Sequence, residues 1–327
     1  MITDSLPAFR LLRPQSVADA ATALAAEPGA RLVAGGTDLL ANLRRGLERP
    51  PVVIDLGAVA GLAEVQHGAD GLTLGAGVTL DRLATDAALA AAWPALGEAA
   101  RAAAGPGHRS AATLGGNLCL DTRCVFYNQS EWWRLANAYC LKRGGSTCHV
   151  APQGSRCHAA FSGDLAPVLL ALDARITLQS VRGTRTLALA EAYRDDGAAH
   201  LTIARDEVLV RAHLPAPAAG TRCAYRKARV RGAMDFPLAG VAVALRLDQG
   251  RIAGLRVALT GTNSHPLLLQ GTEALLGQAV DDAACTALGK LVQKQVSPMR
   301  TTVTAANHRR QVGAVLAQRL LRELAAA

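Results

Sequence analysis

Apolar positions in the first hundred residues recur with a helical period in some stretches and form short uninterrupted runs in others. The first helical stretch follows a serine, which predicts a helix over residues 15–27 with Ser16 as its N-cap. The same patterns predict strands at residues 31–34, 52–56 and 72–78, and helices at residues 39–45, 80–90 and 94–104. This half of the chain therefore mixes strands with helices.

The second half continues the mixture and contains one break. The patterns predict a helix at residues 165–172, strands at residues 174–179, 241–247 and 252–259, and helices from residue 272 onward, the last at residues 311–327. A Pro/Ala/Gly-rich stretch at residues 215–220 is the best candidate for a domain boundary. We therefore expect an α+β protein with a domain of residues 1–215 and a smaller domain of residues 216–327.

Composition changes this picture little but excludes several classes of protein. The chain has 327 residues and is 50% hydrophobic, which is enough for two domains with sizeable cores. The longest apolar runs are too short to span a bilayer, and residues 1–14 lack the apolar core of a secretory signal. We expect a cytoplasmic protein with no membrane segment.

The net charge of +9 is compatible with an acidic partner but gives no support for nucleic acid. Most of the positive charge comes from arginines that are dispersed along the chain, with no recognition motif beside them. An acidic electron-carrier protein, acidic partner subunits and a solvated basic surface without a partner each fit this charge. Hydrolase chemistry has no support, because the chain contains no nucleophile elbow, HExxH motif or Ser-His-Asp arrangement.

A first pair of glycines carries candidate chemistry in the segment Val33-Ala34-Gly35-Gly36-Thr37-Asp38-Leu39. Paired glycines let the backbone approach a ligand, and amides at the start of a helix bind phosphate oxygens. In this segment Thr37 adds a hydroxyl donor and Asp38 is a candidate helix cap. The spacing matches neither a Walker loop nor a Rossmann fingerprint, and a plain left-handed turn is the alternative.

A second glycine pair lies in Thr113-Leu114-Gly115-Gly116-Asn117, and two such loops suit a long diphosphate-bearing cofactor such as FAD. A third element, Ser162-Gly163-Asp164, adds a carboxylate that can accept hydrogen bonds from ribose hydroxyls or an adenine amine. Alone, this third element is more typical of a turn. The order of the three elements is what favours a cofactor site.

Four cysteines between the second and third elements form a candidate metal site: Cys124, Cys140, Cys148 and Cys157. Their C-x15-C-x7-C-x8-C spacing differs from the short pairs typical of zinc. Five of the chain's eleven aromatic residues fall inside the array and offer hydrophobic cover for a metal centre. Iron-sulfur ligation, zinc ligation, disulfides and unligated core thiols all remain open on spacing, although a reducing cytosol weighs against disulfides.

The three elements, with the helix and strand before them, resemble the FAD-binding subunits of the xanthine dehydrogenase family of molybdenum enzymes. The resemblance covers the whole chain and implies an FAD-binding domain of the vanillyl-alcohol-oxidase (PCMH) type, followed by a smaller α+β domain of the CO dehydrogenase flavoprotein type. It implies that the FAD diphosphate lies between the two glycine loops and that Asp164 contacts the adenosine half. It also brings residues 225–237 near the isoalloxazine, where Lys227 or Arg229 would stabilise a reduced flavin; a solvated loop is the alternative.

The cysteine-containing segment, residues 119–159, is an insertion that most flavin subunits of that family lack. Its cysteine spacing and the run Phe126-Tyr-Asn-Gln-Ser-Glu-Trp-Trp133 resemble the β subunits of 4-hydroxybenzoyl-CoA reductases. That resemblance implies a [4Fe-4S] cluster bound by the four cysteines of the array. It leaves Cys119, Cys223 and Cys285 outside the ligand set, as packing residues. We expect His149 and His158 to make contacts at the surface or to lie next to the cysteine ligands, without binding the metal themselves.

By this resemblance the chain handles electrons, while substrate chemistry takes place in another subunit. Ferredoxin would reduce the cluster, and FAD would pass electrons to [2Fe-2S] clusters in a small subunit and to molybdenum in a large one, within a dimer of heterotrimers. The phenolic hydroxyl of 4-hydroxybenzoyl-CoA would there be removed reductively to give benzoyl-CoA. Lys142, Arg143 and Arg156 are candidates for steering an acidic ferredoxin.

Two other classes of function stay open on the sequence. One is the flavin subunit of a xanthine- or CO-dehydrogenase-type hydroxylase that sends electrons outward, with zinc in the insertion. The other is a binding or assembly protein in which the glycine loops are only turns. The content of flavin, iron and zinc separates these alternatives.

Overall fold

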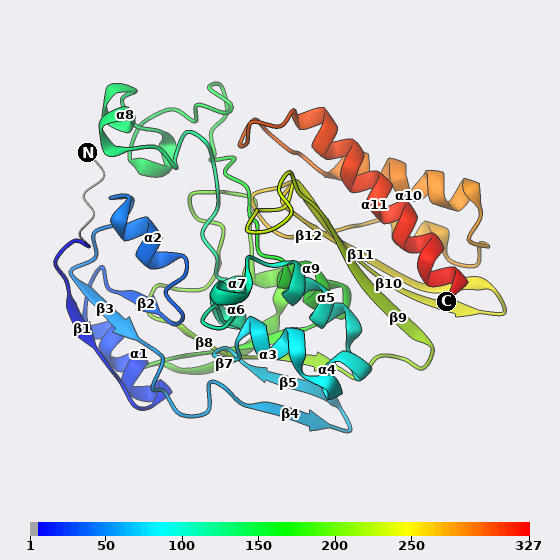
Figure 1. Ribbon diagram of the computed structural model, residues 1–327, viewed down its shortest axis with the longest axis horizontal. Coiled ribbons are helices and arrows are strands. Elements are labelled where there is room, and N and C mark those ends of the chain that lie inside the picture. Colours follow the sequence, from blue (N-terminus) through cyan, green and yellow to red (C-terminus); the bar gives the residue numbers. More distant parts are fainter. Residues whose placement is uncertain (1–5) are drawn as a thin grey trace.

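The computed structural model describes residues 6–327, so the first five residues of the segment 1–14 considered above lie outside it. The N-terminal part is a small parallel sheet in the order β1-β3-β2, with two helices (Figure 1). Its elements are β1 (Arg10–Leu12), α1 (Val17–Ala26), β2 (Arg31–Val33), α2 (Leu39–Arg44) and β3 (Val52–Asp55). Ser16 caps α1 as predicted, because its hydroxyl accepts a hydrogen bond from the amide of Asp19 at 3.1 Å.

The middle of the chain forms a five-stranded antiparallel sheet in the order β4-β5-β8-β6-β7, covered by short helices. The strands are β4 (Val65–Gly68), β5 (Gly71–Gly75), β6 (Arg175–Ser180), β7 (Gly183–Ala188) and β8 (Val208–Pro215). The helices are α3 (Leu80–Thr85), α4 (Ala87–Ala92), α5 (Pro94–Ala102), α6 (Pro106–Arg109), α7 (Leu114–Leu118), α9 (Leu165–Ala171) and the 3-10 helix η2 (Leu189–Ala192). Their apolar side chains share the largest core of the protein.

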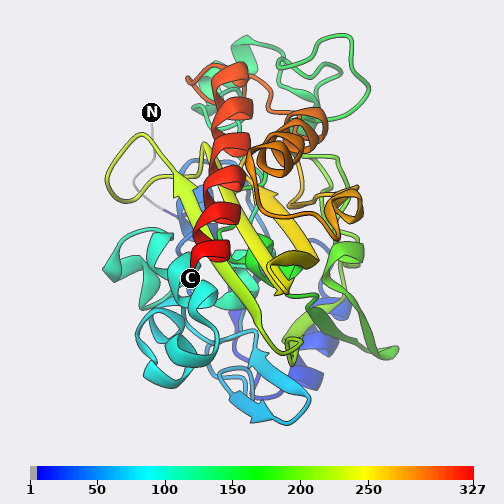
Figure 2. The ribbon, with the colours of Figure 1, turned by 90° about the vertical axis from the view of Figure 1, so that its right-hand side faces the viewer.

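The C-terminal part is a four-stranded antiparallel sheet in the order β12-β11-β10-β9, with two long helices across one face (Figure 2). Its elements are β9 (Thr221–Ala228), β10 (Ala239–Asp248), β11 (Arg251–Thr260), β12 (Leu267–Leu268), η3 (Thr272–Leu275), α10 (Asp282–Gln295) and α11 (Ala306–Ala326). Alternate residues of β10 face opposite ways: Val241 and Val243 join the core beneath α10 and α11, whereas Ala242 and Ala244 join the core that contains α9. The two parts of the chain therefore pack directly on each other.

The insertion forms a separate lobe beside α2, at the upper edge of Figure 1. It contains α8 (Glu131–Ala136) and the 3-10 helix η1 (Leu141–Arg143). An antiparallel bridge between Arg123 and Ala160 closes its base. The buried guanidinium of Arg134 holds the lobe on the N-terminal part, because it donates to the carbonyl oxygens of Tyr127 in the insertion and Gly46 after α2.

The helices and strands that the sequence predicted are present, with two kinds of difference. The helix expected at residues 80–90 is divided at Asp86, whose carboxylate caps α4 by accepting from the amides of Ala88 and Leu89. Six strands were not predicted: β1, β4, β7, β8, β9 and β12. Of these, β4 and β7 have mostly exposed residues and lack a buried apolar run. The stretch at residues 215–220 links β8 to β9. Within residues 6–327, no helix combines the length and the apolar character needed to cross a membrane.

His200 gives the fold a pH dependence that can be measured. Its ring packs 5.8 Å from that of Phe161, and burial lowers its pKa to about 4. The folded-state pKa lies below the value of 6.5 for free histidine, so the unfolded chain binds a proton first as pH falls. Stability is therefore lost between about pH 6.5 and pH 4, by roughly 1 kcal/mol at pH 5.5.

We expect His200→Gln to reduce this loss. Urea unfolding at pH 7.5 and pH 5.5 measures it in both proteins, and the difference between the two pH values should be smaller in the variant. An unchanged difference would show that other groups cause the acid sensitivity.

Candidate functional site

The two glycine loops predicted from sequence lie against each other. Gly35, between β2 and α2, packs so tightly on the carbonyl group of Ala111 that a Cβ atom at this position would overlap it. Gly36 has a φ of +69°, in the left-handed region that favours glycine. Thr37, which lies between the two glycines and α2, is exposed, whereas its neighbours in the loop are half-buried. The first loop therefore needs glycine for packing and for backbone conformation, and it stays open on one side.

The second loop is the start of α7. Thr113 is the N-cap, and its hydroxyl accepts a hydrogen bond from the amide of Gly116 at 3.1 Å. A Cβ atom on Gly115 would lie 2.8 Å from that of Ala76, so this glycine too is required by close packing. The side chain of Asn117 accepts from the amide of Leu165 at 2.9 Å, which joins the second loop to the third element.

The third element lies on the second loop and is buried beneath it. A Cβ atom on Gly163 would lie 2.5 Å from the carbonyl oxygen of Asn117. Both carboxylate oxygens of Asp164 are already used, one by the hydroxyl of Tyr225 at 2.7 Å and one by the ammonium of Lys227 at 3.0 Å. Burial raises the pKa of Asp164, and the nearby Lys227 charge opposes that rise. All three predicted elements therefore meet, but Asp164 and Lys227 bind each other.

Asp38 has a different role from the helix cap that the sequence suggested. Its backbone is already helical, with φ −107° and ψ −54°, and no hydrogen bond to its side chain caps α2, so that prediction is wrong. The carboxylate instead forms an ion pair with Arg123 and accepts from the side chain of Asn42 at 3.2 Å. Burial lowers the pKa of Arg123 to about 10, and its guanidinium lies 5.1 Å from the ring centre of Phe236. Arg123 thus connects the first loop, the insertion and the loop after β9.

The four cysteines of the array line one cavity inside the insertion, together with Phe126, Tyr127, Leu141, Lys142, His149, Val150 and Ala159. All four side chains are buried and none forms a disulfide. Burial raises the pKa of Cys124, and raises that of Cys157 to about 12. The cavity alone therefore does not favour thiolates, whereas a bound metal would, because a coordinated thiol loses its proton.

The backbone before Cys140 is held in an unusual conformation. Ala138 and Tyr139 have φ values of +53° and +56°, a region that non-glycine residues rarely adopt. The Tyr139 hydroxyl donates to Glu131 at 2.9 Å, and the Tyr139 carbonyl contacts the ring of His149 at 2.9 Å. Strain of this kind is found at functional sites, and the next residue, Cys140, lies in the cavity wall.

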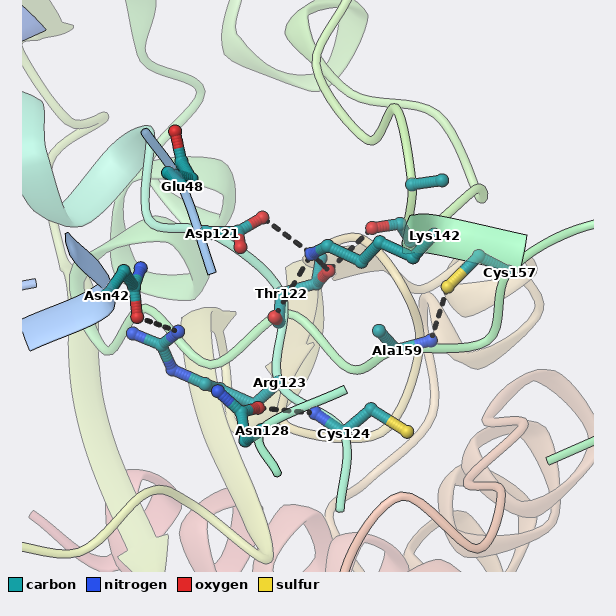
Figure 3. A network of polar contacts seen from close by, with 12 residues as sticks. Asn42, Glu48, Asp121, Thr122, Arg123, Cys124, Asn128, Lys142, Cys157 and Ala159 are labelled. Carbon is teal, nitrogen blue, oxygen red and sulfur yellow. Dashed lines mark hydrogen bonds and ion pairs between the residues drawn. The ribbon is translucent and has the colours of Figure 1, made fainter. Parts of the chain in front are cut away.

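Lys142 is buried in the wall of the same cavity, so its predicted role in steering a partner is wrong. Its side chain is only 6% exposed, and its ammonium donates to Asp121 and Thr122 (Figure 3). Arg156 is more accessible but forms an ion pair with Asp195 at 2.6 Å. The sequence showed these positive charges but not their partners, which lie 21 and 39 residues away.

The remaining cysteines lie outside the array, as predicted. Cys119 and Cys223 pack against the core of the middle sheet, and Cys285, on the buried face of α10, belongs to the C-terminal core. Within residues 6–327, no group of three or more His, Cys, Asp or Glu side chains is arranged to hold a metal ion. The sequence analysis did not identify Tyr225, whose hydroxyl donates to Asp164, as a residue of the site. A signal was present, because Tyr225, Lys227 and Arg229 alternate along β9 and its end, which is the spacing of side chains on one face of a strand.

The two glycine loops and the third element meet in the fold, and comparison with known proteins identifies the family. Residues 7–217 match the family "FAD binding domain in molybdopterin dehydrogenase", and residues 223–324 match "CO dehydrogenase flavoprotein C-terminal domain". The chain belongs to the FAD-binding subunits of the xanthine dehydrogenase and CO dehydrogenase type of molybdenum hydroxylases. It is an oxidoreductase subunit, and the expected fold class is confirmed.

Individual relatives support this membership. The FAD-binding subunit PaoB of aldehyde oxidoreductase from Escherichia coli K12 is 32% identical over 84% of this chain and 87% of its own length. The xanthine dehydrogenase FAD-binding subunit of Escherichia coli O157:H7 is 28% identical over 96% and 95%. In fold, reconstituted CO dehydrogenase from Oligotropha carboxidovorans matches with a TM-score of 0.81 at 24% identity, covering 98% of this chain and 99% of that chain.

Proposed function

We propose that this chain is the FAD and [4Fe-4S] subunit of a cytoplasmic enzyme of the 4-hydroxybenzoyl-CoA reductase type. The observation that carries the proposal is the cavity lined by Cys124, Cys140, Cys148 and Cys157, in an insertion placed between two elements of the flavin site. Molybdenum and the substrate would lie in a large partner subunit and [2Fe-2S] clusters in a small one, in a dimer of heterotrimers. The substrate reaction is reductive dehydroxylation to benzoyl-CoA.

The donor set of the cavity suits an iron-sulfur cluster. Zinc is also bound by four cysteines, but typically through short C-x2-4-C pairs, which this array lacks. A cubane cluster is a larger body whose four irons each take one cysteine, so four separated thiols facing one cavity are the donor set it requires.

The flavin site fits FAD through its packed glycines. We assign the diphosphate to the two loops, at residues 33–39 and at Thr113, Gly115, Gly116 and Asn117, because the close packing of Gly35 brings the first loop to the residues before the second, while Thr37 and Gly116 stay exposed. Asp164 and Lys227 act as a buried pair that fixes β9 against this site, and Lys227 also donates to the carbonyl oxygen of Ala102 at 3.0 Å. When bound, the cluster supplies single electrons and the FAD accepts one or two, which permits transfer toward the partner subunits.

An acidic ferredoxin is the proposed electron donor, and α8 offers a surface for it. Trp132 and Leu135 are 74% and 60% exposed and lie three residues apart on one face of the helix. The exposed Arg44, Arg45 and Arg49 lie in and after α2, next to α8, which Arg134 ties to Gly46 at 3.2 Å. None of these three arginines forms an ion pair in the described part of the chain, so the apolar face has a positive rim.

This surface predicts that reduction by the donor depends on salt. We expect the rate of reduction of the wild-type complex by ferredoxin to fall as ionic strength rises, and Arg45→Glu to lower it about three- to tenfold at low salt. Stopped-flow absorbance measures the rate. Arg319→Glu, an exposed arginine on α11, is the matched control and should change the rate little. Equal effects of both substitutions, or a rate independent of salt, would rule out docking at α8.

A second candidate function follows from the named relatives, which include xanthine and aldehyde oxidoreductase subunits. The chain would then belong to a hydroxylase that passes electrons outward from FAD, with zinc in the insertion. Metal analysis of the purified subunit decides between the two. About four irons with acid-labile sulfide and one flavin support the reductase. Zinc with flavin supports the hydroxylase, and a protein without flavin contradicts both.

A further inference from the structure

Lys142 places a buried positive charge in the wall of the cysteine cavity. It lines the cavity with the four thiols, although its side chain is only 6% exposed. An ammonium group is costly to bury without partners, so a lysine at this position calls for an explanation. The insertion has no need of a charge for packing, because Tyr127, Leu47 and Ala159 already form an apolar core around the cavity.

The partners of Lys142 fix its ammonium group in place. All three of its donors are used: by Asp121 at 2.6 Å, by the Thr122 hydroxyl at 2.6 Å and by the Thr122 carbonyl oxygen at 3.2 Å (Figure 3). The nitrogen also lies 4.5 Å from the ring centre of Tyr127. Because these groups hold it from several sides, the charge cannot turn away toward solvent.

The positive charge of Lys142 acts on the cavity more strongly than the negative charge of its partner Asp121. Lys142 lines the cavity, whereas Asp121 does not, and the Asp121 side chain is 26% exposed. Solvent therefore screens the carboxylate more than the ammonium. The Lys142 side chain lies in the same cavity wall as the four thiols, so its charge acts on the array itself. The cavity thus experiences a net positive potential from this pair.

We propose that Lys142 raises the reduction potential of the [4Fe-4S] cluster, an inference that rests on the function proposed above. Reduction transfers one electron from the donor to the cluster and adds one negative charge inside the cavity, with no bond made or broken. A fixed positive charge beside the thiolate ligands stabilises that more negative state. Lys142 is a positioning residue in this sense, since it acts through the field at the cluster and contacts no substrate.

The test is the one-electron potential of the cluster in the complete complex, measured by potentiometric titration with electron paramagnetic resonance. Lys142→Met should make the one-electron reduction equilibrium about tenfold less favourable, which is a shift of about −59 mV. Lys142→Gln, a shorter neutral side chain, should shift it in the same direction and serves if the methionine variant does not fold. Lys294→Met, an exposed lysine on α10, is the matched control and should leave the potential unchanged.

A purely structural role for Lys142 is distinguished by Asp121→Asn. This change breaks the same ion pair but keeps the ammonium, so a structural role predicts a change in the same direction as Lys142→Met. The electrostatic role predicts the opposite sign, a more positive potential. Unchanged potentials in the Lys142 variants, or shifts of one sign in all variants, would overturn the inference. A wild-type complex without a [4Fe-4S] signal would instead overturn the proposed function.

Discussion

Cys140→Ser should remove the [4Fe-4S] cluster from this subunit and leave its FAD bound. Cys140 is one of the four thiols that line the cavity, and a cubane cluster needs a thiolate on each iron. A serine hydroxyl at a buried position keeps its proton and is a poor ligand for iron. The glycine loops that we assign to FAD lie outside the insertion, so flavin binding has no direct need of this cysteine.

Iron, sulfide and flavin content of the purified subunit measure this effect. The matched control is Cys285→Ser, which removes another buried thiol but in the core beneath α10 and α11. It should retain its iron. If Cys140→Ser keeps its full iron content, the assignment of ligands fails. If Cys285→Ser loses iron as well, the metal is lost through general destabilisation and not through a missing ligand.

Gly35→Ala should abolish FAD binding or leave it at least tenfold weaker. The new Cβ atom would overlap the backbone carbonyl of Ala111, which cannot rotate away as a side chain would. The two loops must then separate, and overpacking of this kind costs about 1–3 kcal/mol or more. Because the proposed diphosphate site is formed by both loops together, their separation removes its geometry.

Flavin fluorescence after denaturation gives the FAD content, and circular dichroism shows whether the variant is folded. Gly107→Ala is the matched control, because a Cβ atom at that glycine meets nothing within 4 Å. It should bind FAD normally. A Gly35→Ala protein with full FAD content would mean that the cofactor does not lie between these loops.

The parts of the fold that sequence could predict are those fixed by neighbouring residues. Ser16 predicts the start of α1 because a cap and its amide partner are three residues apart. Val241 and Val243, two residues apart, predict the buried face of β10 in the same local way. The exposed strands β4 and β7 carry no such signal. They exist because they pair with β5 and β6.

The same distinction applies to the site. The glycine loops and the four cysteines were found because their residue types are unusual in themselves. The roles of Asp38 and Lys142 were misjudged, because each depends on a partner far away in sequence: Arg123 for the first and Asp121 for the second. Long-range pairs of this kind turn an apparent cap or surface charge into a buried contact, and no local pattern records them.

The bridge between Arg123 and Ala160 brings the two ends of the insertion side by side. A chain without the insertion needs only a tight turn to join them, although it also loses the contacts of Arg123 with Asp38 and of Arg134 with Gly46. A segment can therefore be added at this point of the chain without a change in the order of the surrounding strands and helices. On the function proposed above, such an addition gives a flavoprotein a second way to receive electrons.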